Sequence, residues 1–433
     1  MSKNFAVAVL DIGTTGVRML VGRVNENGTP KIIAKADAMC RGGIKAVDDY
    51  DRGGLPDAIA NVVDSIKAKT GLEVKSAYVS LRNDNISFIN SKGNISIRES
   101  SDSVTCMDVG ELLNDASAVD LSDDERLVDV IPLAYYADGR KLSEKPEGTS
   151  CARLSVDANI VVGKRSRLEK IENIMKDVGL SVDGFVPSFF SAQKVLPSAC
   201  FVSPSVSCCR TLVADIGGEF SEYSVFYNGI PFAFGTVNSG GSRITKDLSI
   251  VLNISQNEAE RLKLDYPIAS QVTPGSDVEV AIFPLEKGEK EMVNISYVVE
   301  IMQARICEIT ENIISAALAD MSEKGMERPS VDRIILIGEG IAEFSGVNAA
   351  LHDIVGDTEL EVINIGRDIG MKNSYSIATG MLLYISSKLQ YGRRPSKIIR
   401  ESVDTRNEET VKRGKIINNV KGKIKSWWML FKE

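Results

Sequence analysis

The chain has 433 residues, 43% of them hydrophobic and 25% charged, and this length exceeds what one hydrophobic core usually serves, so we expect at least two domains. Residues 412–433 contain seven basic residues and one acidic residue, a net charge of +6, so the formal net charge of −8 leaves −14 for the rest. Such an acidic body argues against a broad nucleic-acid surface, and the single histidine, His352, excludes a histidine-rich metal site.

The cysteines and the N-terminal residues indicate the cellular compartment of the protein. The seven cysteines show no CxxC pair and no spacing typical of disulfides. Asp11 interrupts the apolar stretch that a secretion signal would need. We therefore expect a protein of the reducing cytosol.

The N-terminal segment predicts a β-hairpin. Alternating apolar residues indicate strands at 5–12 and 17–24, joined by the turn GTTG. Glycines at such a turn let backbone N–H groups approach a ligand, and an Asp at the end of a strand, here Asp11, can hold a metal ion through water. An ordinary hairpin is the simpler interpretation of one such turn.

Residues 81 to about 160 predict a small α+β layer with one strand, one helix and two further strands. The segment returns into RLEKIENIMKDVGL, so we expect a module inserted into the first half of the chain. The helix is indicated by the apolar spacing of Val109, Leu112, Leu113 and Ala116.

A second hairpin repeats the first. VADIGG at 213–218 follows the pattern of VLDIGT at 9–14, and predicts the strands TLVADI and SEYSVFYNG around the turn GGEF. Because the turn occurs twice, we favour two turns that clamp a polyphosphate from both sides over two ordinary hairpins.

Two further landmarks suit a nucleotide site. Residues 331–347, VDRIILIGEGIAEFSGV, predict a buried strand, a glycine turn and a helix, which allows close backbone approach to a nucleoside. Residues 374–384, SYSIATGMLLY, predict an apolar helix with small residues for tight packing beside the first hairpin. Each alone is better explained by plain packing.

The C-terminal region predicts a tether. Residues 392–411 show no apolar periodicity and predict a flexible linker, and residues 412–433 predict an amphipathic helix. Its longest apolar run, Trp427–Phe431, is too short to span a bilayer, so we favour a helix in the membrane interface over one packed on its own domain or a partner's groove. The apolar face comprises Ile417, Val420, Ile424, Trp427, Trp428 and Phe431, and Lys421, Lys423, Lys425 and Lys432 flank it.

We call the two hairpins the phosphate hairpins, the glycine turn within 331–347 the adenosine turn, and the apolar helix at 374–384 the Ala-Thr-Gly helix. In this order, these segments resemble the actin, hexokinase and heat-shock chaperone superfamily. Within it, GTVNSGGSRITKDLSIVLNISQNEAERLKLDYPIA at 235–269 and the segment at 81–160 are similar to the FtsA family, the actin-like proteins of bacterial cell division. The resemblance runs from Phe5 to the C-terminus. It implies an α/β actin-like duplicated nucleotide-binding fold with a small inserted α+β subdomain and a C-terminal amphipathic helix.

The resemblance also implies the domain limits. Residues 81–160 would be the inserted subdomain, and residues 392–411 and 412–433 the linker and the helix. The first actin-like half would comprise 1–80, 161–200 and 365–391, and the second 201–364, with 241–325 as its outer subdomain.

ATP and Mg²⁺ are the cofactors that the resemblance implies. Asp11 and Asp215 would hold the Mg²⁺ through water. The nucleotide-binding residues would be Asp11, Gly13, Thr14, Thr15 and Arg18 in the first turn, Asp215, Gly217 and Gly218 in the second, Glu260 and Lys263 on the purine side, and Gly338 and Gly340 in the adenosine turn.

The chain departs from the family at three positions. Gly16 stands where the family commonly has Lys, and Glu219 and Glu339 stand where it has Gly. We expect Arg18 to supply the missing positive charge. A carboxylate at Glu219 repels a triphosphate unless Mg²⁺ or an outward rotamer intervenes, so we expect ATP binding with at most slow hydrolysis.

The partners implied by the resemblance are the C-terminal peptide of the tubulin-like FtsZ, further copies of the chain in filaments, anionic membrane lipids and other division proteins, with no nucleic acid. The family's contact helix carries an Arg followed three residues later by Glu, which Arg305 and Glu308 match. A solvated ion pair within the helix is the alternative interpretation of these two residues.

The function implied is that of an ATP-binding adaptor that self-associates on the cytoplasmic face of the cell membrane at the division septum, tethers FtsZ filaments there and helps to recruit later division proteins. A metabolic small-molecule kinase of the same fold is the alternative, because fold alone does not decide function. Its catalytic base or acid would be Asp215 or Glu222.

Overall fold

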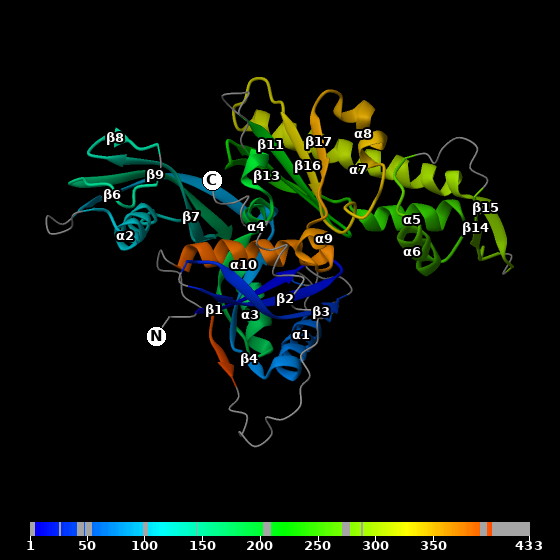
Figure 1. The fold of residues 1–433 in the computed structure, drawn as a ribbon, viewed down its shortest axis with the longest axis horizontal. Helices are drawn as coiled ribbons and strands as arrows, with labels where there is room; N and C mark the ends of the chain where they lie inside the picture. The colour runs from blue at the N-terminus through cyan, green and yellow to red at the C-terminus, as the bar shows by residue number, and fades with distance from the viewer. Residues whose placement is uncertain are drawn as a thin grey trace, which may run out of the picture. The chain divides into compact units, whose positions relative to one another are not determined.

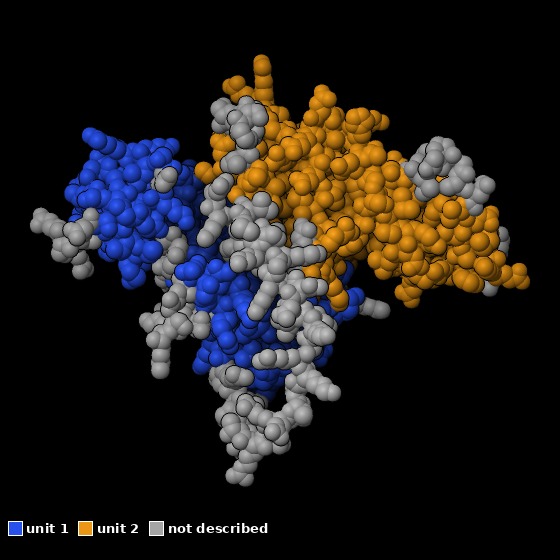
Figure 2. All heavy atoms as spheres, in the orientation of Figure 1, with its two compact units in different colours: residues 1–194, 377–409 blue, residues 195–376, 410–433 orange. Residues whose placement is uncertain are grey.

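The computed structural model describes residues 5–25, 27–40, 47, 54–97, 103–143, 145–201, 209–270, 278–286, 289–389 and 396–400. The chain forms two compact units, which Figure 2 distinguishes by colour. Unit 1 comprises residues 1–194 and 377–409, and unit 2 comprises residues 195–376 and 410–433. Residues 195–200 and 365–376, which we expected in the first half, fall in unit 2.

Unit 1 contains a mixed five-stranded sheet with the order β10-β5-β1-β2-β3. The central hairpin is antiparallel, and β5 and β10 continue the sheet in parallel from β1. Val7, Ala8, Val9 and Leu10 are fully buried, which explains the continuous apolar run of the first strand. The predicted strands at 5–12 and 17–24 are confirmed to within one residue. The strands are β1 (Phe5–Ile12), β2 (Gly16–Val24), β3 (Pro30–Met39), β5 (Ser76–Leu81) and β10 (Ser181–Pro187).

Helices accompany this sheet in unit 1 (Figure 1). The first begins after Gly54, has a proline in its first turn, and ends at Gly71, whose φ of 67° permits the left-handed cap. The helices are α1 (Leu55–Thr70), α3 (Arg165–Asp177), α4 (Ser188–Val195) and α10 (Ser376–Lys388), and η2 (Asn83–Asn85) is a 3₁₀ turn.

A short strand lies inside the region expected to be a linker. β18 (Ile398–Arg400) pairs antiparallel with β4 (Leu72–Val74), and the N–H of Ser396 donates to the carbonyl of Ala6 at 2.9 Å. The remainder of the expected linker at 392–411 lies outside the described residues. The helix expected at 412–433 lies wholly outside them.

The inserted subdomain is an antiparallel sheet with the order β6-β9-β7-β8, covered by one helix. Val109, Leu112 and Ala116 of that helix are buried in the subdomain core, and Leu113 is partly buried against it. The expected strand, helix and two strands are therefore confirmed, with a two-residue strand added. The elements are β6 (Ile86–Ser96), α2 (Cys106–Ala116), β7 (Glu125–Ala137), β8 (Arg140–Lys141) and β9 (Arg153–Lys164).

Unit 2 repeats the sheet of unit 1. Its order, β13-β12-β11-β16-β17, has the same two antiparallel pairings followed by two parallel pairings. This common topology confirms that the repeated turn belongs to a duplicated half and not to two unrelated hairpins. The strands are β11 (Arg210–Ile216), β12 (Ser221–Tyr227), β13 (Ile230–Val237), β16 (Arg333–Ile337) and β17 (Glu359–Val362).

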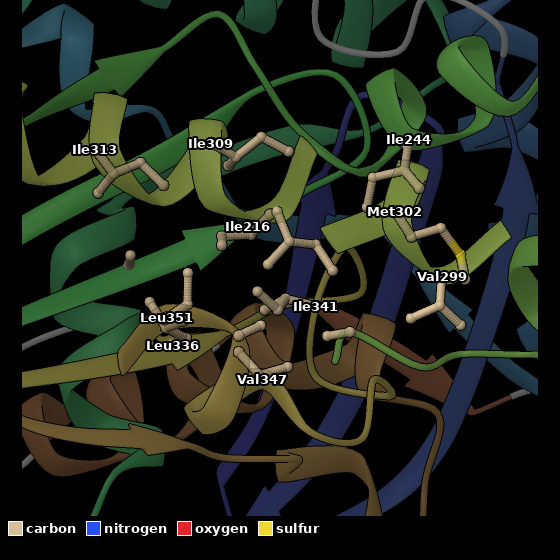
Figure 3. Packing of buried hydrophobic residues seen from close by; sticks show 14 of the residues in the cluster. Ile216, Ile244, Val299, Met302, Ile309, Ile313, Leu336, Ile341, Val347 and Leu351 are labelled. Atoms are coloured by element: carbon tan, nitrogen blue, oxygen red, sulfur yellow. The ribbon is translucent and has the colours of Figure 1, made fainter. Parts of the chain in front are cut away.

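The core of unit 2 joins this sheet to the long helix α7 (Ile295–Glu323). Figure 3 shows Ile309 and Ile313 of α7 and Ile216 and Leu336 of the sheet among its buried residues. The other elements are α5 (Gly241–Val251), α6 (Gln256–Asp265), α8 (Val347–Val355), α9 (Ile365–Ile369), β14 (Glu279–Ile282), β15 (Glu291–Asn294) and the 3₁₀ turns η3 (Ser198–Phe201) and η4 (Asn373–Tyr375). None of the helices that the structure describes is long and apolar enough to cross a bilayer.

Candidate functional site

The first glycine turn is closed by its own backbone and by Arg18. The N–H of Gly13 donates to the carbonyl of Gly16 at 3.0 Å. The buried Arg18 guanidinium donates from Nη1 to the same carbonyl at 3.1 Å and from Nη2 to Thr15 Oγ1 at 3.4 Å. A Cβ at Gly13 would overlap Nη1 of Arg18. The expected positive charge of Arg18 therefore lies on the turn itself.

Asp11 and Arg18 are directly opposite each other in the register of β1 and β2. Residues paired in this way project from the same face of the sheet. Both residues are only 8% exposed. The structure thus brings the predicted carboxylate and the predicted cation together at the base of the first turn.

Gly16 has a steric reason to be glycine. A Cβ at this position would lie 2.5 Å from the carbonyl oxygen of Ala38 in β3, which is closer than real Cβ contacts allow. Any side chain would therefore push on the neighbouring strand, and a lysine at position 16 would do so as well. The close approach of β3 therefore leaves no room for a side chain at position 16 of this chain.

The second turn is packed backbone against backbone. The N–H of Gly217 donates to the Phe220 carbonyl at 3.0 Å, and the N–H of Gly340 donates to the Ile216 carbonyl at 2.8 Å. At the start of α5, the N–H groups of Gly241 and Ser242 donate to the carbonyls of Gly217 and Gly218 at 2.9 and 2.7 Å. The structure therefore brings together the predicted second turn and adenosine turn, and adds the N-terminus of α5.

Several glycines are required at this junction. A Cβ at Gly240 would lie 2.6 Å from the carbonyl oxygens of Gly217 and Gly218, and a Cβ at Gly340 would lie 2.7 Å from that of Gly217. Gly338 has a φ of 99° and lies so close to Asp215 that a Cβ would overlap its Oδ1. Gly240 and Gly241 were not predicted as site residues, although both lie in the stretch 235–269 that resembles the FtsA family.

Asp215 and Glu222, the two candidate bases, are direct partners in the register of β11 and β12. Two carboxylates in this arrangement repel each other, and carboxylate oxygens are ligands that Mg²⁺ accepts. This pair fits a Mg²⁺ ion held directly or through water. Within the described ranges there is no group of three or more His, Cys, Asp or Glu side chains that could hold a metal.

Glu260 and Lys263, predicted on the purine side, bind each other and α5. Lys263 Nζ donates to Glu260 Oε2 at 2.7 Å and to Thr245 Oγ1 at 2.9 Å. Thr245 Oγ1 donates in turn to Glu260 Oε2 at 2.5 Å. The network connects α6 to the helix whose first residues lie on the second turn. Thr245 is a member that the sequence analysis missed.

Arg305 has one more partner than expected. Its Nη1 donates to Glu308 Oε2 at 2.6 Å within α7, and its Nε donates to Asp247 Oδ2 of α5 at 2.5 Å. The Asp247 hydrogen bond raises the pKa of the guanidinium above its ordinary value. The Arg305 side chain is 21% exposed and Glu308 is 53% exposed. Arg305 thus links two helices, and Glu308 is the more accessible of the predicted pair.

A polar cavity of about 440 Å³ lies within unit 1, at the base of the inserted subdomain. Arg126 of β7 donates two hydrogen bonds, at 2.9 and 2.7 Å, to Glu172 of α3, and its guanidinium lies 5.5 Å from the centroid of the Phe185 ring. These three side chains line the cavity together with Asp129 and Lys388.

Comparison with known proteins matches two family models to the chain. The model described as the SHS2 domain inserted in FtsA matches residues 83–162, which contain the inserted sheet. The model described as cell division protein FtsA matches residues 212–381. Both matches fall in regions that the sequence analysis found similar to that family.

Whole-chain relatives carry the same description. The cell division protein FtsA of Borreliella burgdorferi is 23% identical, over 99% of this chain and 99% of its own length. The cell division protein FtsA of Neisseria meningitidis serogroup B is 25% identical, over 79% of this chain and 80% of its own length.

Solved structures resemble the chain more distantly. A chain of the PilM–PilN type IV pilus biogenesis complex aligns with a TM-score of 0.52 and 15% identity, over 87% of this chain and 97% of its own length. The likeness concerns the fold alone, and the expected α/β actin-like fold, with two mixed sheets and an inserted antiparallel subdomain, is confirmed. MreB5 of Spiroplasma citri bound to ADP aligns with a TM-score of 0.49 and 11% identity, over 90% of this chain and 99% of that one.

Proposed function

We propose, from the premise that the chain belongs to the FtsA family of cell division proteins, that it is an ATP-binding adaptor which self-associates on the cytoplasmic face of the cell membrane and tethers FtsZ filaments at the division site. The proposal rests on the observation that one chain combines duplicated glycine turns with the inserted β6-β9-β7-β8 subdomain. No observation favours the metabolic kinase.

The nucleotide part of the proposal rests on the glycine turns. The N–H groups of Gly241, Ser242 and Gly340 already donate to turn carbonyls. Within the described residues, the N–H of Gly218 has no protein acceptor, so it is the donor in the second turn that we assign to a phosphate oxygen. Arg18 would add positive charge at the first turn. Mg²⁺, when bound near Asp215, would neutralise phosphate charge.

We assign slow hydrolysis to this site. Glu219 lies in the second turn and Glu339 between the two glycines of the adenosine turn, where the family commonly has glycine. Carboxylates near a triphosphate repel its phosphate groups and so oppose the phosphoryl transfer. We expect turnover well below the roughly 1 to 100 per second of kinases.

The partner surface is proposed on the outer subdomain of unit 2. Glu308 and Arg305 present charge there, and exposed apolar side chains lie on the same subdomain, including Tyr297 on α7 and Ile250 on α5. A peptide with both apolar and charged side chains, as proposed for FtsZ, fits such a surface. The cavity beside Arg126 and Glu172 is our candidate for contacts with later division proteins.

Membrane attachment is proposed from the sequence of residues 412–433 alone. Tryptophans and lysines on one amphipathic segment suit an anionic lipid surface, because the rings enter the interface and the lysines are attracted to the headgroups.

Calorimetry with ATP and measurement of phosphate release test the proposed class. An adaptor binds ATP and releases phosphate slowly whichever small metabolite is added. Release in the range of kinases, stimulated by a small metabolite, would favour an enzyme instead.

A further inference from the structure

One end of unit 1 is basic although the body of the chain is acidic. It is built from the last turn of α1, the strand β4 that follows it, and β18, the orange-red strand of Figure 1. Residues 67–75 and 396–400 carry a net charge of +4, whereas residues 1–411 as a whole carry −14. We call this region the basic end. Its charged residues are Lys67, Lys69, Lys75, Lys397, Arg400 and one acid, Glu73.

Backbone and side-chain contacts bring the two segments of the basic end together. The N–H of Lys75 donates to the carbonyl of Lys397 at 2.8 Å, next to the pairing of β18 with β4. Glu73 Oε1 lies 2.7 Å from Nζ of Lys75 and 3.9 Å from Nζ of Lys67. One carboxylate is therefore shared by two ammonium groups, and the positive charge is in excess.

Lys69 and Lys397 have no such partner. Both residues are exposed, and within the described ranges neither forms an ion pair or a side-chain hydrogen bond. A cation in the last turn of α1 also stabilises the helix dipole, which gives Lys67 and Lys69 a structural role. That role does not extend to Lys75 and Lys397, because both lie outside the helix. An excess of exposed cations at one end suits an anionic partner.

The position of β18 indicates which anionic partner this is. β18 ends at Arg400, and only residues 401–411 separate it from the segment at 412–433 that we propose to bind lipid. A flexible chain of this length spans roughly 20 Å, which is about two Debye lengths at physiological salt. Attachment of the segment would therefore bring the end of β18 close to the membrane. An acidic body so near anionic lipid is repelled unless its basic end faces the surface.

We propose that the basic end of unit 1 is a second contact with anionic lipid headgroups, beside the one made by residues 412–433. The inference rests on the proposed membrane attachment and adds to it which face of unit 1 lies on the lipid. Lysines suit such a surface, because compact ammonium groups on flexible stems attract headgroup phosphates without a fixed geometry.

Residues 401–411 are the competing partner for the same lysines. They contain four acidic residues and one basic residue, so they offer negative charge within the chain itself. If they neutralised the basic end, removing lysine charge from it would leave lipid binding unchanged.

Phosphatidylglycerol vesicles are the probe, and phosphatidylcholine vesicles are the neutral reference. Binding of the full chain is compared between Lys69→Gln with Lys397→Gln and a control, Lys92→Gln with Lys141→Gln, which removes the same charge from exposed lysines of the inserted subdomain. A lysine near an anionic surface contributes roughly fivefold in affinity. The first variant should therefore bind phosphatidylglycerol roughly five- to twentyfold more weakly than the control. The difference should vanish on phosphatidylcholine and at high salt.

Tryptophan fluorescence separates this contact from the one made by the C-terminal segment. The two tryptophans of the chain, Trp427 and Trp428, both lie in that segment, so their emission reports its insertion alone. At saturating phosphatidylglycerol, Lys69→Gln with Lys397→Gln should reach the wild-type emission. A variant whose emission stayed unshifted would show that the lysines act through the segment, and would overturn the proposal.

Three other outcomes would also contradict the proposal. Equal binding of the variant and the control to phosphatidylglycerol would remove the basic end as a lipid contact and leave the C-terminal attachment in place. The same equal binding with a lower thermal midpoint for Lys69→Gln with Lys397→Gln would assign these lysines a purely structural role. If the wild-type chain did not bind the vesicles at all, the proposed membrane attachment would itself be wrong, and this second contact with it.

Discussion

Restoring the family's lysine at position 16 should damage the first turn and not improve it. A Cβ there would lie 2.5 Å from the Ala38 carbonyl oxygen and 3.3 Å from Met39 Cα, and both are backbone atoms of β3 that cannot rotate away. Overpacking of this kind costs about 1–3 kcal/mol. Reduced freedom of the unfolded chain offsets about 0.4–1 kcal/mol of that cost.

We therefore expect Gly16→Lys and Gly16→Ala to be destabilised alike, by about 1–2 kcal/mol, which corresponds to a fall of roughly 2–8 °C in the thermal midpoint. Both variants carry the same Cβ and only one carries a charge, so their comparison separates steric from electrostatic effects. Thermal unfolding and ATP calorimetry are the assays. A Gly16→Lys protein with a wild-type midpoint and tighter ATP binding would refute the steric explanation of Gly16.

Four further predictions follow from the same contacts. Asp11→Ala and Gly217→Val should each weaken ATP binding in calorimetry. The first disturbs metal-bound water, and the second places a Cβ 2.8 Å from the Phe220 carbonyl oxygen. Unchanged ATP affinity in both variants would show that the turns do not belong to the nucleotide site. Arg305→Glu should abolish binding of the FtsZ C-terminal peptide in fluorescence anisotropy. It should also lower the thermal midpoint, because the new carboxylate lies beside those of Asp247 and Glu308. A wild-type peptide affinity would show that the contact lies elsewhere. Trp427→Glu with Trp428→Glu should release the protein from liposomes at any salt concentration. Replacing Lys421, Lys423 and Lys425 with Gln should weaken binding to anionic liposomes only. Sedimentation of the double-Glu variant at the wild-type level would contradict the membrane assignment. The Arg210 hydrogen bonds hold the pKa of Asp332 below its ordinary 3.8, so the stability that this carboxylate contributes is present at neutral pH and is lost as the pH falls below that value through its folded-state pKa. Asp332→Asn should cost about 0.5 kcal/mol at pH 7 after solvent screening and nothing in strong acid, and a difference from wild type that stays constant with pH would argue against the pair.

The strand and turn pattern was readable from sequence because it depends on local signals. The apolar runs in FAVAVLDI and TLVADI indicated the first strand of each hairpin, and the spacing of Val109, Leu112 and Ala116 indicated the helix of the inserted subdomain. The duplicated sheet followed from the repeated turn. The motifs also predicted the glycine turn at Gly338 and Gly340, which the structure joins to the second turn through Gly340 and Ile216.

The remaining features depend on residues far apart in the chain. The steric need for Gly16 comes from Ala38 in another strand, and the second partner of Arg305 lies 58 residues away. The short strand β18 forms in the expected linker because residues 398–400 pair with β4. Three residues are too few to show a periodicity, so the sequence could not predict this pairing.

The measurement that tests the central claim most directly is liposome co-sedimentation of FtsZ with this protein, in the presence of ATP and Mg²⁺, using the full chain and a chain without residues 412–433. We expect FtsZ to sediment with liposomes only when the full chain is present, and Arg305→Glu to leave FtsZ in the supernatant while the variant itself still sediments. If FtsZ sedimented equally well with the shortened chain, or if the full chain failed to bring it down, the protein would not be a membrane tether for FtsZ.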